Sequence, residues 1–336
     1  MYIIKKIFLL FTALFMVFAI PCYAYDFDYG YSVCVGIVDS GVNGDEVRIT
    51  QGYNLLEDNT DVTDNKGHGT KIAQIISDIV PKAELIALKC TEYNQNNDNS
   101  AIIKAIYKAV DDYKCDVLNI SIGMPDTEEL KNAIDYATQK GCIIVSAVGN
   151  DGEISYKKGK VYYPAGYEDV VGVGAVDESG TVCEYSQKNN SVFVTTESNE
   201  GTSFSAAKIT GAAAVAKQFD KRITPSLFMK FLQKASQDCG DVGYDTSYGH
   251  GGFDFNAFQE ALVSHYSLLA TEKNDGIVTV HNLSDSSVTA KVVQNNGCKE
   301  ILFEPKGKTQ FDINTISECF IWQKSIYDII WIEKGE

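Results

Sequence analysis

The chain has 336 residues, of which 45% are hydrophobic and 22% charged, and its formal net charge is −16. This length and hydrophobic content suit one large domain with an appendage, or two domains, with a sizeable buried core. The acidic balance argues against nucleic acid as a partner, because phosphate binding needs clustered Lys and Arg side chains.

The first 24 residues have the composition of a secretory signal peptide. Lys5 and Lys6 precede an apolar run over 7–20, and Ala24 ends a short segment suited to cleavage. The apolar run is too short to cross a bilayer comfortably. We therefore expect residues 1–24 to be removed on export. The mature protein is expected to have no stable membrane span and to be secreted, in the extracellular space or associated with the cell surface.

Five short, nearly continuous apolar runs predict strands that are buried on both faces. Helical patterns alternate with them, and Asp126 is the expected N-cap of the helix around 130–137, with Glu129 three residues on. Strands alternating with such helices predict an α/β domain with a mostly parallel central sheet covered on both sides. The runs lie at 32–39, 84–90, 116–123, 142–150 and 170–176.

Export permits disulfides, and Cys298 and Cys319 in the C-terminal segment are the best candidate pair, but the cysteines show no pattern typical of a metal site. Cys34, Cys90, Cys115 and Cys142 lie in or beside the apolar runs, where cysteine commonly serves as a small buried hydrophobe. The chain has only four histidines, and no cluster with metal-ligand spacing is present. We expect neither a metal ion nor a cofactor.

The pattern changes after residue 264. Short β-like runs follow, separated by Asp, Ser, Asn and Gly. We therefore expect the α/β domain to span 25–264 and a small β-rich C-terminal domain to span 265–336.

Three residues with potential chemistry lie at ends of the expected elements. Asp39 follows the first strand, His68 begins an expected helix, and Ser203 lies between a Gly-Thr turn and a run of small residues. Taken singly, each has an ordinary structural interpretation, as a turn former, a helix-start residue or a helix cap.

Together these residues resemble the motifs of the subtilisin-like serine peptidase (subtilase) family. Asp-Ser-Gly begins at Asp39, His-Gly-Thr at His68, and Gly-Thr-Ser ends at Ser203, while Asn150 ends the strand run 142–150. The resemblance covers about 30–264 and implies a subtilisin-like three-layer fold. It also implies that Ser203 is the nucleophile, His68 the general base and Asp39 the group that orients His68. Asn150 would donate to the oxyanion.

The same resemblance implies where a peptide substrate would bind. Residues 118–123 resemble the edge at which an extended peptide pairs with Ser121, Ile122 and Gly123. In the segment 161–176, the position that forms the floor of the pocket for the residue before the cut bond falls on Tyr162. A phenol ring there predicts cleavage after small residues, unless the ring is turned to solvent or the alignment is shifted.

Three features depart from the family pattern. Ala207 occupies a position where the family usually carries proline, and only 25–31 separate the expected cleavage point from the first strand, where many members have a propeptide. The insertion that often builds a calcium site after the histidine helix is also missing from 77–90. Ala207 and the missing propeptide keep a catalytically silent peptide-binding protein open as an alternative, although the intact Asp39, His68, Asn150 and Ser203 count against it.

The leading expectation is a secreted serine endopeptidase that acts on an extended peptide or protein. An acyl-transferring ligase or cyclase would use the same residues. The sequence does not decide between a scavenging protease and a dedicated maturation protease, and it leaves the oligomeric state open.

Overall fold

The computed structural model describes residues 32–93, 99–266, 269–274, 277–282, 287–294 and 297–312. The expected signal peptide and the last of the β-like runs that follow residue 264, at 319–324 and beginning with Cys319, lie outside the described residues.

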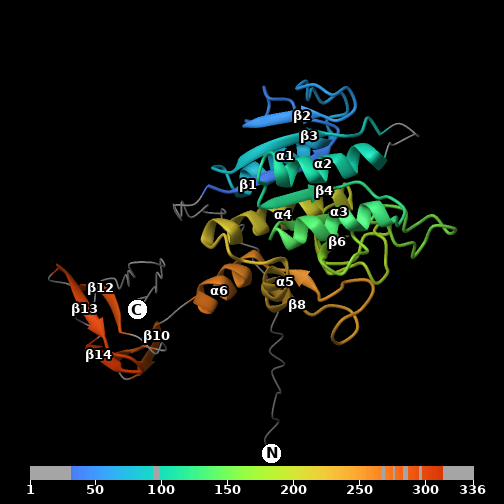
Figure 1. Ribbon diagram of the computed structural model, residues 1–336. Helices are drawn as coiled ribbons and strands as arrows, with labels where there is room; N and C mark the ends of the chain where they lie inside the picture. Colours follow the sequence, from blue (N-terminus) through green and yellow to red (C-terminus); the bar gives the residue numbers. More distant parts are fainter. Residues whose placement is uncertain are drawn as a thin grey trace, which may run out of the picture.

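A nine-stranded sheet forms the centre of the fold, in the order β2-β3-β1-β4-β5-β6-β7-β9-β8 (Figure 1). All five apolar runs form strands of this sheet, and its neighbours pair in parallel except β8 with β9. The expected mostly parallel α/β sheet is therefore confirmed. The strands are β1 Cys34–Asp39, β2 Gln51–Asn54, β3 Glu84–Lys89, β4 Val117–Ile120, β5 Ile143–Ala147, β6 Val170–Val176, β7 Val194–Glu197, β8 Ser236–Gln237 and β9 Gly252–Phe253.

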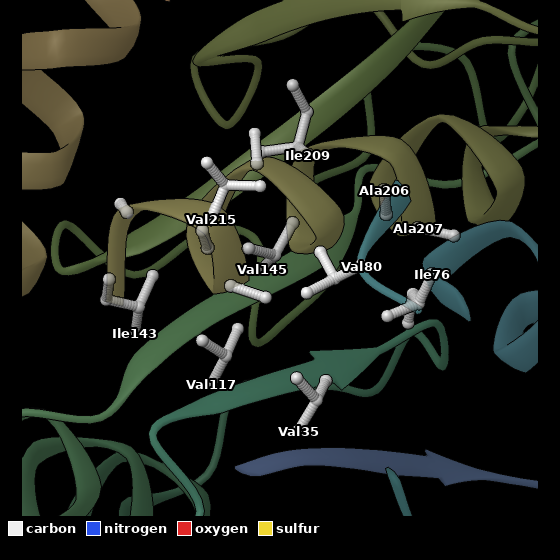
Figure 2. Close-up of a cluster of buried hydrophobic side chains, with 14 of the residues drawn as sticks. Val35, Ile76, Val80, Val117, Ile143, Val145, Ala206, Ala207, Ile209 and Val215 are labelled. Carbon is white, nitrogen blue, oxygen red and sulfur yellow. The ribbon is translucent and has the colours of Figure 1, made fainter. Parts of the chain in front are cut away.

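Helices cover both faces of the sheet, which gives three layers. One apolar cluster joins the sheet to α1 and α4, and a second joins it to α2 and α3. Figure 2 shows the first cluster, in which Val35, Val117 and Val145 of the strands face Ile76 of α1 and Ile209 of α4. The helices are α1 His68–Ile79, α2 Asn99–Asp111, α3 Glu128–Gln139, α4 Thr202–Phe219, α5 Pro225–Lys234 and α6 Phe255–Tyr266.

Helix α4 is the central helix of its layer, and small side chains let it pack closely. Ala206 and Ala207 are fully buried. The helix is continuous through Ala207, the position where the family usually carries proline. A Cβ on Gly211 would lie 2.9 Å from Ile79 Cβ, an atom fixed to the backbone of α1, so glycine permits this close approach of α4 to α1. The close packing fixes the start of α4 relative to the start of α1.

Strand β1 lies at the point where the chain changes direction across the sheet. Its neighbours are β3 on one side and β4 on the other. In open α/β sheets, sites form beyond the carboxyl ends of the strands at such a point. Asp39 is the last residue of β1.

The expected N-cap of α3 is wrong by one residue. Thr127 is the cap, with extended backbone and a side chain that accepts a 3.2 Å hydrogen bond from Leu130 N–H. Asp126 instead accepts a 2.7 Å hydrogen bond from the Tyr167 hydroxyl. The Asp126 carboxylate therefore binds Tyr167, which is distant in the sequence, and does not cap the helix. The burial expected of Cys34, Cys90, Cys115 and Cys142 is confirmed, and all four are free thiols.

The C-terminal region forms antiparallel strands, which confirms its β-rich character over the described residues. β10 Leu269–Asn274, β11 Ile277–Asn282 and β14 Lys308–Asp312 form one sheet, and β12 Val288–Gln294 pairs with β13 Gly297–Phe303. Strand β10 was not expected, because its residues are largely polar and carry no alternating pattern. Within the described ranges, no helix has the length and apolar character needed to cross a membrane.

Candidate active site

The carboxylate of Asp39 is fully buried and carries its hydrogen bonds on one oxygen. Oδ1 accepts from Ser40 N–H at 2.7 Å and lies 2.8 Å from His68 Nδ1. Oδ2 is buried and has no hydrogen-bond partner among the described residues. The negative charge is therefore compensated mainly at Oδ1, on the side that faces His68.

Asp64 fixes the loop that precedes His68, although the sequence gave no reason to single it out. Its Oδ1 accepts from Gly67 N–H and from Ser40 Oγ, both at 2.9 Å, and its Oδ2 accepts from Thr70 N–H at 2.9 Å. Because Ser40 adjoins Asp39 and Thr70 belongs to α1, these bonds tie the end of β1 to the start of the helix. His68 begins α1 as expected from the sequence.

The surroundings of His68 favour its protonated form. Burial by itself would lower the pKa of His68, but the hydrogen bond and negative charge of Asp39, with a smaller contribution from Asp64, raise the pKa above its ordinary value of 6.5. Such an imidazole can accept a proton and hold the resulting charge.

Ser203 lies inside helix α4 and does not cap it. The N-cap is Gly201, at φ 148° and without a side-chain hydrogen bond, and Ser203 is the second helical residue. The interpretation of Ser203 as a helix cap is therefore wrong. The Phe204 ring packs against the His68 ring with centroids 5.5 Å apart, and Lys71 Nζ lies 4.7 Å from the Phe204 ring centroid. The residue next to Ser203 thus contacts His68 directly.

Asn150 is held against the start of α4 by its amide oxygen. Oδ1 accepts from both Thr202 N–H and Thr202 Oγ at 2.9 Å. Because Thr202 N–H can only donate, the accepting atom must be the oxygen, which leaves the Nδ2 group to donate elsewhere. A Cβ on Gly201 would lie 3.3 Å from Asn150 Nδ2, so this amide lies beside the turn that leads to Ser203.

The expected substrate edge continues from β4 and is anchored to α4. Asn119 Nδ2 donates to Ser121 Oγ at 2.9 Å, and Thr210 Oγ of α4 donates to Asn119 Oδ1 at 2.9 Å. Beyond Ile122 and Gly123, Met124 pairs with Tyr163 in an antiparallel bridge. This bridge brings the 161–164 segment alongside the end of the expected edge.

Tyr162 packs against the ends of two strand segments. A Cβ on Gly123 would lie 3.1 Å from Tyr162 Cγ, and a Cβ on Gly149 would lie 2.8 Å from Tyr162 Cδ2. The Tyr162 hydroxyl donates to Asp151, and Lys160 Nζ lies 4.8 Å from the ring centroid. Burial and the bond to Asp151 raise the pKa of Tyr162 to about 12. The half-buried ring is held between Gly123 and Gly149 rather than turned freely to solvent.

Tyr93 is a further aromatic residue at this site that the sequence did not single out. Its hydroxyl lies 3.1 Å from Asp39 Oδ1 and 2.8 Å from His68 Nδ1. It stands four residues after the end of β3, in a polar segment that resembles no motif, so only the three-dimensional arrangement reveals it.

Comparison with known proteins assigns the fold and the family. Residues 30–251 match the model of the subtilase family. The chain is 30% identical to subtilisin DY of Bacillus licheniformis over 66% of its own length and 89% of that protein. It is 28% identical to the minor extracellular protease Epr of Bacillus subtilis over 68% of its length, but spans only 38% of that relative.

The fold is also similar to the solved structure of MycP1 with its N-terminal propeptide removed. The alignment covers 71% of this chain and 93% of the MycP1 chain, with a TM-score of 0.60 and 26% sequence identity. The matched region contains every strand of the nine-stranded sheet except β9, together with the Asp39–His68 pair, Asn150 and Ser203. The chain belongs to the subtilase family of serine-type endopeptidases.

Proposed function

We propose that the protein is a secreted serine endopeptidase in which Asp39, His68 and Ser203 form the catalytic triad. The observation that carries this proposal is the 2.8 Å contact of His68 Nδ1 with the buried Asp39 carboxylate, on a ring that packs against the residue after Ser203. In this arrangement Asp39 holds one nitrogen of His68 and leaves the other for Ser203.

The proposed reaction follows from these roles. His68 removes the proton of Ser203 as the hydroxyl attacks the peptide carbonyl, and later gives that proton to the leaving amine. Asp39 stabilises the imidazolium formed in between. The Asn150 Nδ2 group and the Ser203 N–H, which is in the first turn of α4 and has no intrahelical acceptor, would stabilise the oxyanion. Water then hydrolyses the acyl-enzyme.

A fluorophosphonate probe tests this function without knowledge of the substrate. The mature protein should be labelled at Ser203, and the Ser203→Ala variant should not be labelled. Absence of labelling in the folded wild type would instead support the catalytically silent peptide-binding alternative. If labelling occurs, product masses with and without an added amine distinguish hydrolysis from acyl transfer.

As the pH is lowered, activity is expected to be lost with a midpoint above pH 6.5. Only neutral His68 can accept the Ser203 proton, and the Asp39 carboxylate raises the pKa of His68 above 6.5. Protonation therefore begins to inactivate the free enzyme at a higher pH than for an isolated imidazole. The measurement is the pH dependence of kcat/KM, and an acidic midpoint below 6.5 would contradict the raised pKa of His68.

Tyr162 is expected to restrict the residue before the cut bond to Ala, Ser or Gly. Its ring lies between Gly123 and Gly149 and would occupy the space that a large side chain needs. Tyr162→Gly should raise kcat/KM for a Phe-containing peptide about 10–200-fold over its wild-type value. Tyr162→Phe is the matched control, because it keeps the ring and removes only the bond to Asp151. A wild-type preference for Phe would show that the pocket is elsewhere.

Export is expected to yield a mature chain that begins near Tyr25. The basic and apolar segments before Ala24 have the order of a secretory signal. Intact-mass analysis of protein collected outside the cells measures the start. A first residue well beyond 30 would indicate further processing, and full-length protein retained in the cells would contradict secretion.

A further inference from the structure

The hydroxyl of Tyr93 completes a triangle with the two groups that form the Asp39–His68 pair. Its oxygen lies 3.1 Å from Asp39 Oδ1 and 2.8 Å from His68 Nδ1, and these two atoms are themselves 2.8 Å apart. The Tyr93 ring also meets the His68 ring edge-on, with centroids 5.0 Å apart and an interplanar angle of 68°. The phenol therefore contacts both members of the pair at the hydrogen bond between them.

Two proton arrangements fit this triangle. In the first, the Tyr93 O–H points to Asp39 Oδ1, and the His68 Nδ1–H points to Asp39 Oδ1, to the Tyr93 oxygen or to both. In the second, the Tyr93 O–H points to His68 Nδ1, so that the imidazole carries its proton on Nε2. Only the first leaves Nε2 able to take a proton from Ser203, because only then is Nε2 the unprotonated nitrogen.

The charge of Asp39 selects the first arrangement. Its Oδ2 is buried without a partner among the described residues, so the carboxylate depends on donors at Oδ1. In the second arrangement, Oδ1 would lose both His68 and Tyr93 and rely on Ser40 alone. An under-satisfied buried carboxylate is costly, and hydrogen bonds to a charged acceptor are stronger than those to a neutral one.

We propose that Tyr93 is a positioning residue that holds Asp39 and His68 in the proton arrangement required for catalysis. The inference rests on the proposed function of the triad and extends it by a group outside the three residues. Tyr93 has no direct role in bond making. It acts by donating to Asp39 Oδ1 and by packing against the His68 ring.

The Tyr93 phenol remains a donor over the working pH range. Burial near the site, with the negative charge of Asp39, raises the pKa of Tyr93 well above its ordinary value of 10.0, so the hydroxyl stays protonated. Tyr93 is 40% exposed. Replacement by phenylalanine keeps the ring and removes only the hydroxyl.

Loss of the hydroxyl should change the pKa of His68 in a defined direction. A donor to Oδ1 disperses the carboxylate charge, so its removal strengthens the attraction of Asp39 for the imidazolium and raises the pKa of His68. Besides Asp39, the ionisable groups among the described residues that act most strongly on His68 or Tyr93 are Asp64 in the preceding loop, Lys71 on α1 and Cys90 after β3. All three are unchanged in a Tyr93→Phe variant.

The experiment measures the rate constant for fluorophosphonate labelling of Ser203 between pH 5 and 10. Tyr93→Phe should label about 10-fold more slowly at the plateau, and its acidic midpoint should move up by about half a unit. Tyr136→Phe is the matched control, because its hydroxyl also donates to a carboxylate, that of Asp111 at 2.7 Å, on the surface between α2 and α3. Its profile should equal that of the wild type.

Three outcomes would overturn the inference. The first is a Tyr93→Phe profile identical to the wild type, and the second is slower labelling without a shift of the midpoint, which indicates a merely structural effect. The third is a change seen only in Tyr93→Leu, which would assign the effect to the ring and not to the hydroxyl. Failure of the wild type itself to label would refute the proposed triad, so the two hypotheses fail separately.

Discussion

Replacement of Ser203 by Ala is expected to reduce kcat/KM for a peptide substrate by about 10⁴–10⁶-fold while the Tm stays nearly unchanged. The variant lacks the only atom proposed to attack the carbonyl, so no acyl-enzyme can form. The fold should tolerate the change, because Ser203 lies within the first turn of α4 and alanine is the best helix former. Peptide hydrolysis and thermal unfolding, measured on the same preparation, test both halves of this prediction.

His68→Ala provides the check that Ser203 acts through a base. Residues that work as a unit have strongly non-additive effects, so the Ser203→Ala, His68→Ala double variant should be no slower than either single variant. Losses that multiply would mean that the two side chains act independently. Full activity in either single variant would refute the triad.

Replacement of Asn150 by Ala is expected to lower kcat about 10²–10³-fold with a much smaller change in KM. The Asn150 amide would donate to the oxyanion, which exists only in the transition state and the tetrahedral intermediate, so ground-state binding is largely spared. Steady-state kinetics on a peptide that the wild type cleaves separate the two parameters. A rise in KM with unchanged kcat would assign Asn150 to substrate binding instead.

Thr202 offers a graded test of the same group. Its N–H and its hydroxyl both hold Asn150 Oδ1 at 2.9 Å. Thr202→Val removes the hydroxyl donor, keeps the backbone donor and loosens the amide, so kcat should fall by less than in Asn150→Ala. Thr202→Ser retains both donors and should remain close to the wild type. Equal losses in the valine and serine variants would point to packing rather than to amide orientation.

Local sequence was sufficient for the elements that repeat a simple pattern. The apolar runs that became β1, β3, β4, β5 and β6 are buried on both faces, and such strands are recognisable because nearly every residue must be apolar. The start of α1 at His68 was also predictable, since its isoleucines recur on one face of a helix. The family motifs identified Asp39, His68, Asn150 and Ser203 together.

Residues whose roles depend on distant partners could not be found in this way. The sequence predicted Asp126 as a helix cap. In the structure its carboxylate accepts a hydrogen bond from Tyr167, and Thr127 is the cap. Asp64 and Tyr93 carry no local signal, because their partners lie on β1, on α1 and in the loops around them.

The sequence by itself determined the α/β class, most of the strand segments of the central sheet and the family-specific motifs, because burial and short-range geometry impose these patterns on neighbouring residues. Only the tertiary structure decided which side chains surround the Asp39 carboxylate. Tyr93 is 54 residues from Asp39 along the chain. The contact forms because β1 and β3 pair in parallel, so that Asp39 lies opposite Lys89 and the chain beyond β3 returns over the end of β1. Hydrogen bonds made across such a junction are specified by the packing of whole elements, and no short stretch of sequence encodes them.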